Sequence, residues 1–228
     1  MKPFYILIVL LLMIILFVIC LLRYNTMLNE SYWTEKKKDE HKDLLSLIDN
    51  VRNKLRSNNI DYFLIAGTLL GSIRNKKIIP WDDDIDIGVY YTSGSREILN
   101  NKLKNIFDNN PSLTVKKRHF GLKIFDNKTK KFVDIFLFTD IDGVVMFGNK
   151  KSRELWPNAY FHKEELENLE SCELNGDFYS CPTNPENALK RQFGDDVLTT
   201  GRITHLHNSL LDNSIITVYS KFLDNVVH

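Results

Sequence analysis

The sequence has 228 residues, of which 43% are apolar, so it can bury one hydrophobic core of ordinary size but not two domains beside a membrane anchor. Thirty Lys and Arg against 29 Asp and Glu give a formal net charge of +1, which excludes a strong overall field that attracts nucleic acid. We therefore expect one globular domain with a local binding site and no nucleic-acid partner.

The chain begins with an uncharged apolar run, FYILIVLLLMIILFVICLL at residues 4–22, between Lys2 and Arg23. At about 1.5 Å per residue, a helix of this length spans roughly 28 Å, the thickness of a bilayer's hydrocarbon core. The alternative is a cleaved signal peptide, whose apolar stretch is only about 7 to 15 residues long and ends at a small-residue site, which is not found before Arg23. The run predicts a transmembrane signal anchor over residues 4–22, with a cytosolic tail at residues 1–3.

Charge alone leaves the orientation of this anchor open, because basic residues stand on both sides of it. Two N-glycosylation sequons, at Asn29 and Asn127, favour a lumenal body. Residues 23–43 are expected to form a stem, and within them the highly charged residues 31–42 predict either a short stem or the start of a helix. The remaining residues, 44–228, are expected to form the domain.

The elements of this domain follow from periodicity. A helix docked on the body is expected from Leu44, because five apolar residues share one helical face: Leu44, Leu47, Ile48, Val51 and Leu55. Strands are expected at DYFLIAG (61–67), DIDIGVYY (84–91), GLKIF (121–125) and KFVDIFLF (131–138), and an amphipathic helix at SREILNNKLKNIF (95–107). A later helix begins at Pro185, with Asn184 as its cap. Helices and strands mix irregularly, which predicts an α/β or α+β fold, a mixed sheet flanked by helices, rather than a doubly wound sheet.

Two cysteines of the domain, Cys172 and Cys181, flank a hairpin turn at Asn175-Gly176. A two-residue turn places Cys172 opposite Tyr179 and roughly 7 to 8 Å diagonally from Cys181, which is long for a disulfide unless a bulge shortens it. A disulfide and a pair of half-buried thiols both remain open. Zinc is disfavoured, because only two sulfurs are present and no histidine flanks them.

Three aspartates alternate at the start of the strand DIDIGVYY and just before it: Asp82, Asp84 and Asp86. On a strand, Asp84 and Asp86 point to one side, about 6 to 7 Å apart, while the isoleucines between and after them point to the core. Carboxylates this close repel one another unless a cation lies between them, and hard oxygen ligands suit Mg²⁺ or Mn²⁺. The spacing therefore predicts a metal site.

A fourth carboxylate, Asp134, lies in the middle of the otherwise apolar strand KFVDIFLF, where burial is costly without a partner or a metal. Upstream, Gly67 and Thr68 close the first strand, and the expected turn GTLLGSIR offers backbone amides, Gly71 and Arg74 to bind phosphate.

The order of a strand ending in glycine, a helix, an Asp-x-Asp strand and a single aspartate on a later strand resembles the nucleotidyltransferase fold shared with DNA polymerase beta. The motifs GTLLGSIR, IPWDDDIDIGV, GLKIF, FVDIF and LKRQFGDD, over roughly residues 62–196, resemble the LicD family, which includes fukutin and fukutin-related protein. The resemblance implies transfer of an alcohol phosphate, such as phosphocholine or ribitol phosphate, from a CDP-linked donor to a glycan. It also implies a single-pass type II protein of the Golgi or endoplasmic reticulum. The stem is too short for the additional N-terminal domain of the fukutin proteins.

In this interpretation Asp84, Asp86 and Asp134 hold one or two divalent ions, and Asp134 also accepts the proton of the entering hydroxyl. Asp82 binds the second metal or its hydration shell, or else caps a turn together with Asp83. Substrate contacts are assigned to seven residues: Gly67, Thr68, Gly71, Arg74, Trp81, His119 and Lys123. For the last three the alternatives are packing of the Trp81 ring, a surface histidine, and a charge at a strand edge.

Two other functions share these residues. A membrane-tethered protein with a structural cation would use the acidic loop without catalysis, but such a loop takes its ligands from one contiguous segment, and Asp134 is distant in sequence. A nucleotidyltransferase that makes an activated donor from a nucleoside triphosphate would use every residue named. Product analysis with a CDP-linked donor and with CTP distinguishes these two enzymes.

Overall fold

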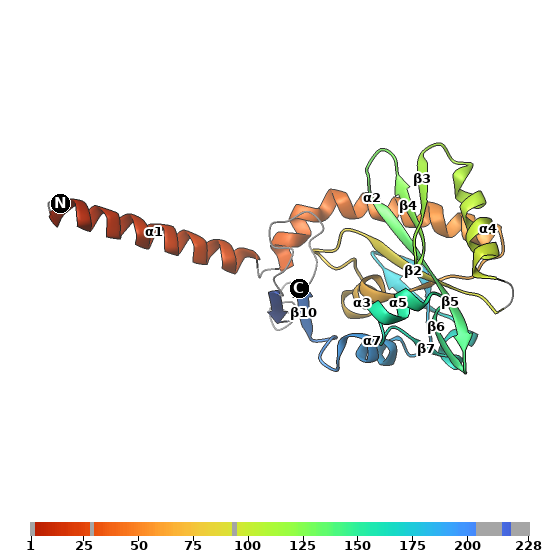
Figure 1. The fold of residues 1–228 in the computed structure, drawn as a ribbon. Coiled ribbons are helices and arrows are strands. Elements are labelled where there is room, and N and C mark those ends of the chain that lie inside the picture. The colour runs from red at the N-terminus through yellow and green to blue at the C-terminus, as the bar shows by residue number, and fades with distance from the viewer. Residues whose placement is uncertain (1–2, 28–29, 93–94, 204–215, 220–228) are drawn as a thin grey trace.

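The structure is a computed structural model that describes residues 3–27, 30–92, 95–203 and 216–219 (Figure 1). Within these residues, a mixed sheet with helices packed beside it forms the body, and a long helix precedes it. The expected α+β class, with a mixed sheet flanked by helices, is confirmed.

The main sheet of the described chain has seven strands: β1 (Phe63–Leu64), β2 (Ile85–Tyr90), β3 (Leu113–Lys117), β4 (Gly121–Asp126), β5 (Phe132–Ile141), β6 (Val144–Phe147) and β7 (Phe161–His162). Five of them lie in the order β1-β2-β5-β4-β3, and β6 pairs with the end of β5 and with β7. Strand β5 runs parallel to β2 and antiparallel to β4 and β6. Its residues 133–138 are all buried, as expected for a strand covered on both faces.

The two faces of β5 differ in what they contact. Val133, Ile135 and Leu137 belong to the core cluster that includes the buried face of α2 (Glu30–Ser57), and α2 packs against β5. Phe136 and Phe138 belong to a second, phenylalanine-rich cluster. Since side chains alternate along a strand, Asp134 lies on the same face as these two rings. This alternation places a carboxylate beside an aromatic surface.

The other described elements are six helices and two antiparallel strand pairs: α1 (Pro3–Met27), α3 (Ala66–Asn75), α4 (Arg96–Asp108), α5 (Lys150–Leu155), α6 (Glu164–Glu167), α7 (Pro185–Phe193), β8 (Glu170–Leu174) with β9 (Asp177–Cys181), and β10 (Thr200–Ile203) with β11 (Ile216–Tyr219). Helix α4 is capped by Ser95, whose Oγ accepts a hydrogen bond from the Ile98 amide at 3.2 Å. Asn184 precedes α7 as expected, but it has a left-handed φ of 54° and its side chain makes no capping hydrogen bond.

Two expectations about local structure were wrong, and a third was decided between its alternatives. The segment GTLLGSIR is not a turn but most of helix α3, and only Phe63 and Leu64 of DYFLIAG form a strand. Helix α2 begins at Glu30, so most of the expected stem is helical and continuous with the docked helix. The end of that stem already packs on the body, because His41 is 8% exposed and Glu40 pairs with Lys131 at 2.5 Å.

Helix α1 contains the apolar run of residues 4–22 and extends away from the body (Figure 1), with its large apolar side chains exposed. Among the described helices, none combines the length and the apolar character needed to cross a bilayer. The transmembrane helix expected here is therefore not supported by the structure. The predicted glycosylation residue Asn29 lies outside the described residues.

The hairpin β8–β9 has the register expected from a two-residue turn, with Cys172 opposite Tyr179. The Cα atoms of Cys172 and Cys181 are 5.9 Å apart, and a disulfide joins the two residues. The distance between these Cα atoms is shorter than the roughly 7 to 8 Å expected for a diagonal pair of residues, so the disulfide forms without a bulge in either strand.

Candidate active site

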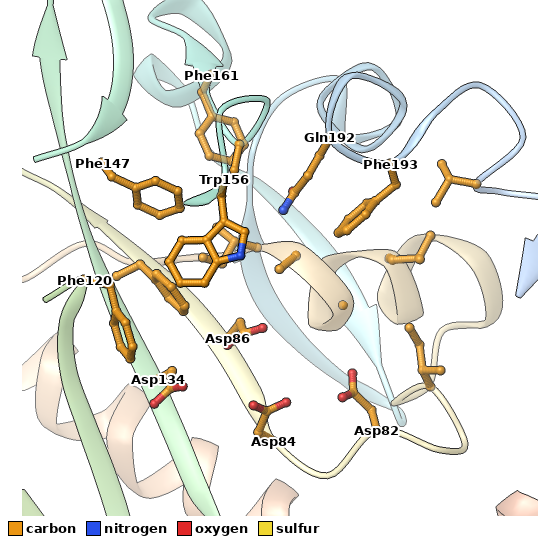
Figure 2. Close-up of a pocket in the computed structure, with 18 of the residues that line it drawn as sticks. Asp82, Asp84, Asp86, Phe120, Asp134, Phe147, Trp156, Phe161, Gln192 and Phe193 are labelled. Carbon is orange, nitrogen blue, oxygen red and sulfur yellow. The ribbon is translucent and has the colours of Figure 1, made fainter. Parts of the chain in front are cut away.

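A cavity of about 540 Å³ lies between α3, β5 and α7 (Figure 2). Four aspartates line one side of it: Asp82, Asp84, Asp86 and Asp134. The opposite side is aromatic, and Gln192 and Phe193 of α7 lie near α3. The cavity therefore joins a carboxylate cluster to an apolar surface.

Strand pairing brings three of these carboxylates together. Asp86 on β2 is the register partner of Asp134 on the parallel strand β5, and Asp84 directly precedes β2. One carboxylate oxygen from each of the three lies within 4.8 Å of the others. The amide of Asp86 donates to Thr68 Oγ1 at 2.9 Å, which fixes the start of β2 against α3. A second group, Asp82, Asp83 and Asp84, meets the same distance criterion along the preceding loop.

The carboxylate of Asp134 has two different surroundings. Its Oδ2 lies 3.1 Å from Lys123 Nζ, on the antiparallel strand β4, where the two residues are register partners. Its Oδ1 is buried and has no hydrogen-bond partner among the described residues. A buried oxygen without a donor is costly, so this atom is suited to a ligand.

The charge on this cluster is unfavourable in the absence of a cation. Burial raises the pKa of the Asp134 carboxyl to about 7, with a contribution from Asp84 and against the opposing effect of Lys123. Burial and the neighbouring Asp84 also raise the pKa of Asp82 and of Asp86 well above the ordinary range. The three oxygens, their separation and these shifts fit a hard divalent cation such as Mg²⁺ or Mn²⁺, held by Asp84, Asp86 and Asp134.

The N-terminus of α3 faces this cavity. Ile65, Ala66 and Gly67 line the cavity, and no side chain caps the helix at Ile65, so its first amides remain available to an anion. A Cβ atom at Gly67 would lie 2.8 Å from Asp82 Oδ2, so glycine is needed for the carboxylate to approach the helix. Arg74, at the other end of α3, also lines the cavity and donates to the Thr200 carbonyl at 3.3 Å.

Six rings form what we call the aromatic wall: Phe120, Phe136, Phe138, Phe147, Trp156 and Phe161. Phe120 stacks on Phe136 with ring centroids 4.4 Å apart, and the Trp156 ring lies 5.8 Å from that of Phe136. Trp156 is the most accessible of the six, at 38% exposure. Among the described residues that line the cavity, Arg74 is the only Lys or Arg.

A sequence model described as LicD/FKTN/FKRP, nucleotidyltransferase domain, matches residues 59–184, which is more than half of the chain and contains all four aspartates. The chain belongs to the LicD family. The resemblance seen in the sequence motifs is thereby confirmed.

Several relatives of this LicD-family chain are known by sequence. It is 28% identical over 150 residues to an uncharacterized protein of Rickettsia prowazekii, covering 66% of this chain and 53% of the relative. It is 30% identical over 114 residues to the lipopolysaccharide cholinephosphotransferase LicD of Haemophilus influenzae, covering 44% of this chain and 42% of that protein. The chain spans about half the length, or less, of these curated relatives.

Some solved structures share a weak likeness with this chain. A crystal structure of ANT(2″)-Ia in complex with adenylyl-2″-tobramycin is 13% identical to the LicD-family chain, with a TM-score of 0.42 over 60% of this chain and 68% of the other. This likeness is too weak to bear on the activity.

The residues predicted from sequence fall into two groups. Seven line the cavity: Gly67, Arg74, Trp81, Asp82, Asp84, Asp86 and Asp134. Four do not line it: Thr68, Gly71, His119 and Lys123. Thr68 and Lys123 instead contact Asp86 and Asp134, Gly71 packs beside the Lys77 carbonyl, and His119 packs against Trp156 with ring centroids 5.8 Å apart. Trp81 is both a cavity residue and a core residue, since it is 6% exposed.

Sequence reasoning missed the aromatic wall and His41. Alternation on β5 was a usable signal, because Phe136 and Phe138 follow Asp134 at intervals of two. Trp156 follows α5 and carried no comparable pattern. His41 lies within the charged segment taken for a stem, yet its Nε2 lies 3.2 Å from the Asp82 carbonyl oxygen.

Proposed function

We propose that this protein is a metal-dependent phosphotransferase that moves an alcohol phosphate from a CDP-linked donor to a hydroxyl group of a glycan. The observation that supports this most directly is the placement of Asp84, Asp86 and Asp134 around one point of a cavity large enough for such a donor. Membership of the LicD family and the cholinephosphotransferase activity for which the Haemophilus influenzae relative is named agree with it.

In this proposal Asp84, Asp86 and Asp134 hold Mg²⁺ or Mn²⁺, and Asp82 belongs to a second ion or to its hydration shell. When bound, the cation neutralises charge that gathers on the transferring phosphoryl group. Asp134, whose Oδ1 is buried and has no hydrogen-bond partner among the described residues, also accepts the proton of the entering hydroxyl. The new bond joins the acceptor oxygen to phosphorus, the bond from phosphorus to the CMP oxygen breaks, and CMP leaves with that electron pair.

The chain's other residues orient the donor. The first amides of α3 and the guanidinium of Arg74 are suited to the diphosphate, because a helix N-terminus and an arginine both favour negative charge. Gln192 and Phe193 offer an amide and a ring to the cytosine base on the same side of the cavity. The base and the alcohol then lie at opposite ends of the cavity.

The aromatic wall favours a methylated ammonium as the alcohol end of the donor. Ring faces attract a quaternary ammonium by about 0.5 to 2 kcal/mol, and the nearby carboxylates add to that attraction. A polyol such as ribitol needs hydrogen-bond partners for several hydroxyl groups, which five phenylalanines and one tryptophan supply poorly. We therefore propose phosphocholine, rather than ribitol phosphate, as the group transferred.

The experiment uses the purified full chain in detergent with CDP-choline, CDP-ethanolamine or CDP-ribitol, and measures CMP release with and without a bacterial envelope glycan fraction. We expect release with CDP-choline and Mn²⁺ or Mg²⁺, and its loss in excess EDTA. Turnover that persists in EDTA would remove the metal from the proposal. Release of pyrophosphate from CTP, with no CMP from any CDP-linked donor, would replace the phosphotransferase with a nucleotidyltransferase.

Location in the Golgi or endoplasmic reticulum and glycosylation at Asn29 and Asn127 stay predictions from the sequence. Asn127 is exposed in the turn between β4 and β5, where its Nδ2 donates to the Pro111 carbonyl at 3.0 Å. A glycosidase-sensitive mass that disappears in Asn127→Gln would support a lumenal body.

A further inference from the structure

The turn of the hairpin β8–β9 contacts the segment that leads from α3 to the acidic loop. The backbone amide of Asn175 donates to the Lys76 carbonyl at 2.7 Å, and Asn175 Oδ1 accepts a hydrogen bond from the Ile78 amide at 2.8 Å. One residue thus binds the backbone on both sides of Lys77. The side chain of Ile78 is only 3% exposed, so its amide has little access to replacement water.

The segment held in this way leads directly to the metal-binding aspartates. The Lys77 amide donates back to the Gly71 carbonyl at 3.2 Å, so residues 76–78 are fixed between α3 and the hairpin. A turn follows, in which the Asp82 amide donates to the Ile79 carbonyl at 2.8 Å. Ile79 and Trp81 are 7% and 6% exposed, which leaves this turn few alternative positions. Residues 76–78 therefore fix the entry to the acidic loop, while the hydrogen bond from the Asp86 amide to Thr68 Oγ1 fixes its other end.

The hairpin is itself attached firmly to the body. Its two strands are joined by the Cys172–Cys181 disulfide. Tyr179 is 1% exposed and donates through its hydroxyl to Asp49 of α2 at 2.8 Å. On the other strand, the Glu173 carbonyl accepts from Ser72 Oγ of α3 at 2.8 Å. A turn anchored at both strands provides a rigid support for the segment that it contacts.

We infer that Asn175 is a positioning residue for the candidate metal site, acting through residues 76–78 to keep Asp82 and Asp84 in place. This inference rests on the proposed function, because it requires that the aspartates bind a divalent cation. Asn175 is distant in sequence from the acidic loop, and the hydrogen bonds that it forms are to the backbone of Lys76 and Ile78 and not to the carboxylates of that loop. Its φ of 54° is in the left-handed region, which Asn, Asp and Gly adopt more readily than other residues.

These preferences allow a matched pair of variants. Asn175→Gly keeps the backbone conformation and removes the acceptor for the Ile78 amide, whereas Asn175→Asp keeps both. The control is Asn59→Gly, the same substitution at a φ of 51° at the end of α2. Calorimetric titration of the full chain in detergent with Mn²⁺ gives the dissociation constant. We expect Asn175→Gly to raise it at least tenfold, and Asn175→Asp and Asn59→Gly to leave it within about threefold.

A second measurement does not depend on how well the variant folds. In the wild-type chain, hydrogen exchange of the peptide covering residues 76–84 should slow when Mn²⁺ is added, because the support and the metal order the same segment. Unchanged exchange, or an Asn175→Gly variant that binds Mn²⁺ as the wild type does, would overturn the positioning role alone. A wild-type chain that binds no Mn²⁺ would overturn the metal site and this inference together.

Discussion

Lys123 Nζ lies 3.1 Å from Oδ2 of Asp134, its register partner across β4 and β5, while Asp134 Oδ1 is buried and has no hydrogen-bond partner in the described chain. The lysine therefore pairs with only one of the two oxygens of this buried carboxylate, Oδ2. Burial still outweighs this pairing, as the raised pKa of Asp134 indicates. This unequal pairing distinguishes an ion pair that serves only stability from a carboxylate kept available for a ligand.

Replacement of Asp134 by Asn tests that distinction. Asp134→Asn keeps the side-chain volume and removes a ligand charge and the proposed proton acceptor, so donor turnover should fall by two or more orders of magnitude, about 3 kcal/mol in barrier. Apo stability should change little or rise, because repulsion with Asp84 and Asp86 is relieved. Steady-state CMP release and an apo melting curve measure the two quantities. Near-normal turnover, or a large fall in apo stability, would make Asp134 a structural residue.

The same substitution should change stability in a pH-dependent way. The folded-state pKa of Asp134, about 7, lies above the value of about 3.9 in an unfolded chain, so the folded protein binds more protons between these two values. The contribution of Asp134 to the free energy of unfolding is therefore most favourable below about pH 4 and is lost as the pH rises through 7. Relative to wild type in EDTA, Asp134→Asn should gain about 1 to 3 kcal/mol between pH 5 and pH 8, measured by urea denaturation. A difference that does not vary with pH would show that Asp134 is ionised throughout.

The grouping of the carboxylates was predictable from sequence because it depends on short-range regularities. The period of two on strands places Asp84 and Asp86 together, and an aspartate inside an apolar strand is unusual enough to identify Asp134. Their joint position needed only the pairing of β2 with β5. The helix α4 followed from an equally local signal, the periodicity of its apolar residues.

The parts that sequence did not predict depend on tertiary contacts. Alternation places Phe136 and Phe138 on the same face as Asp134, but that face becomes a cavity wall only because β6 and the segment after α5 bring Phe147 and Trp156 to it. Two glycines lower the helix propensity of GTLLGSIR, which is why local propensity did not indicate a helix there. The contact that requires Gly71 is tertiary: the Lys77 carbonyl oxygen approaches α3 so closely that a Cβ atom at Gly71 would lie only 2.4 Å from it. His41 resembles part of a solvated stem until it packs beside Asp82.

The two glycines of α3 should respond differently to alanine. At Gly67 the added Cβ meets only the Asp82 carboxylate, which can rotate away, so the fold should keep its stability or gain up to about 1 kcal/mol from helix propensity. Displacing Asp82 should nevertheless lower CMP release about tenfold. At Gly71 the Cβ meets backbone, so Gly71→Ala should destabilise the fold by about 1 to 3 kcal/mol. Thermal melts together with turnover compare the two, and full activity of Gly67→Ala would show that Asp82 has no part in the site.

The aromatic wall is tested at Trp156, the ring whose loss should disturb the fold least because it is partly exposed. Trp156→Leu removes the face that we expect to contact a methylated ammonium, and Trp156→Phe keeps a smaller one. A contact of about 0.5 to 2 kcal/mol corresponds to a rise of roughly 2- to 30-fold in the KM for CDP-choline, with kcat nearly unchanged. The rise should be smaller for CDP-ethanolamine and smaller in Trp156→Phe.

The control is Phe178→Leu, which changes an exposed ring on β9 that does not line the cavity and should leave every KM unchanged. If Trp156→Leu raises the KM equally for CDP-choline, CDP-ethanolamine and CDP-ribitol, the ring contacts the nucleotide that the three donors share, and the alcohol is selected elsewhere.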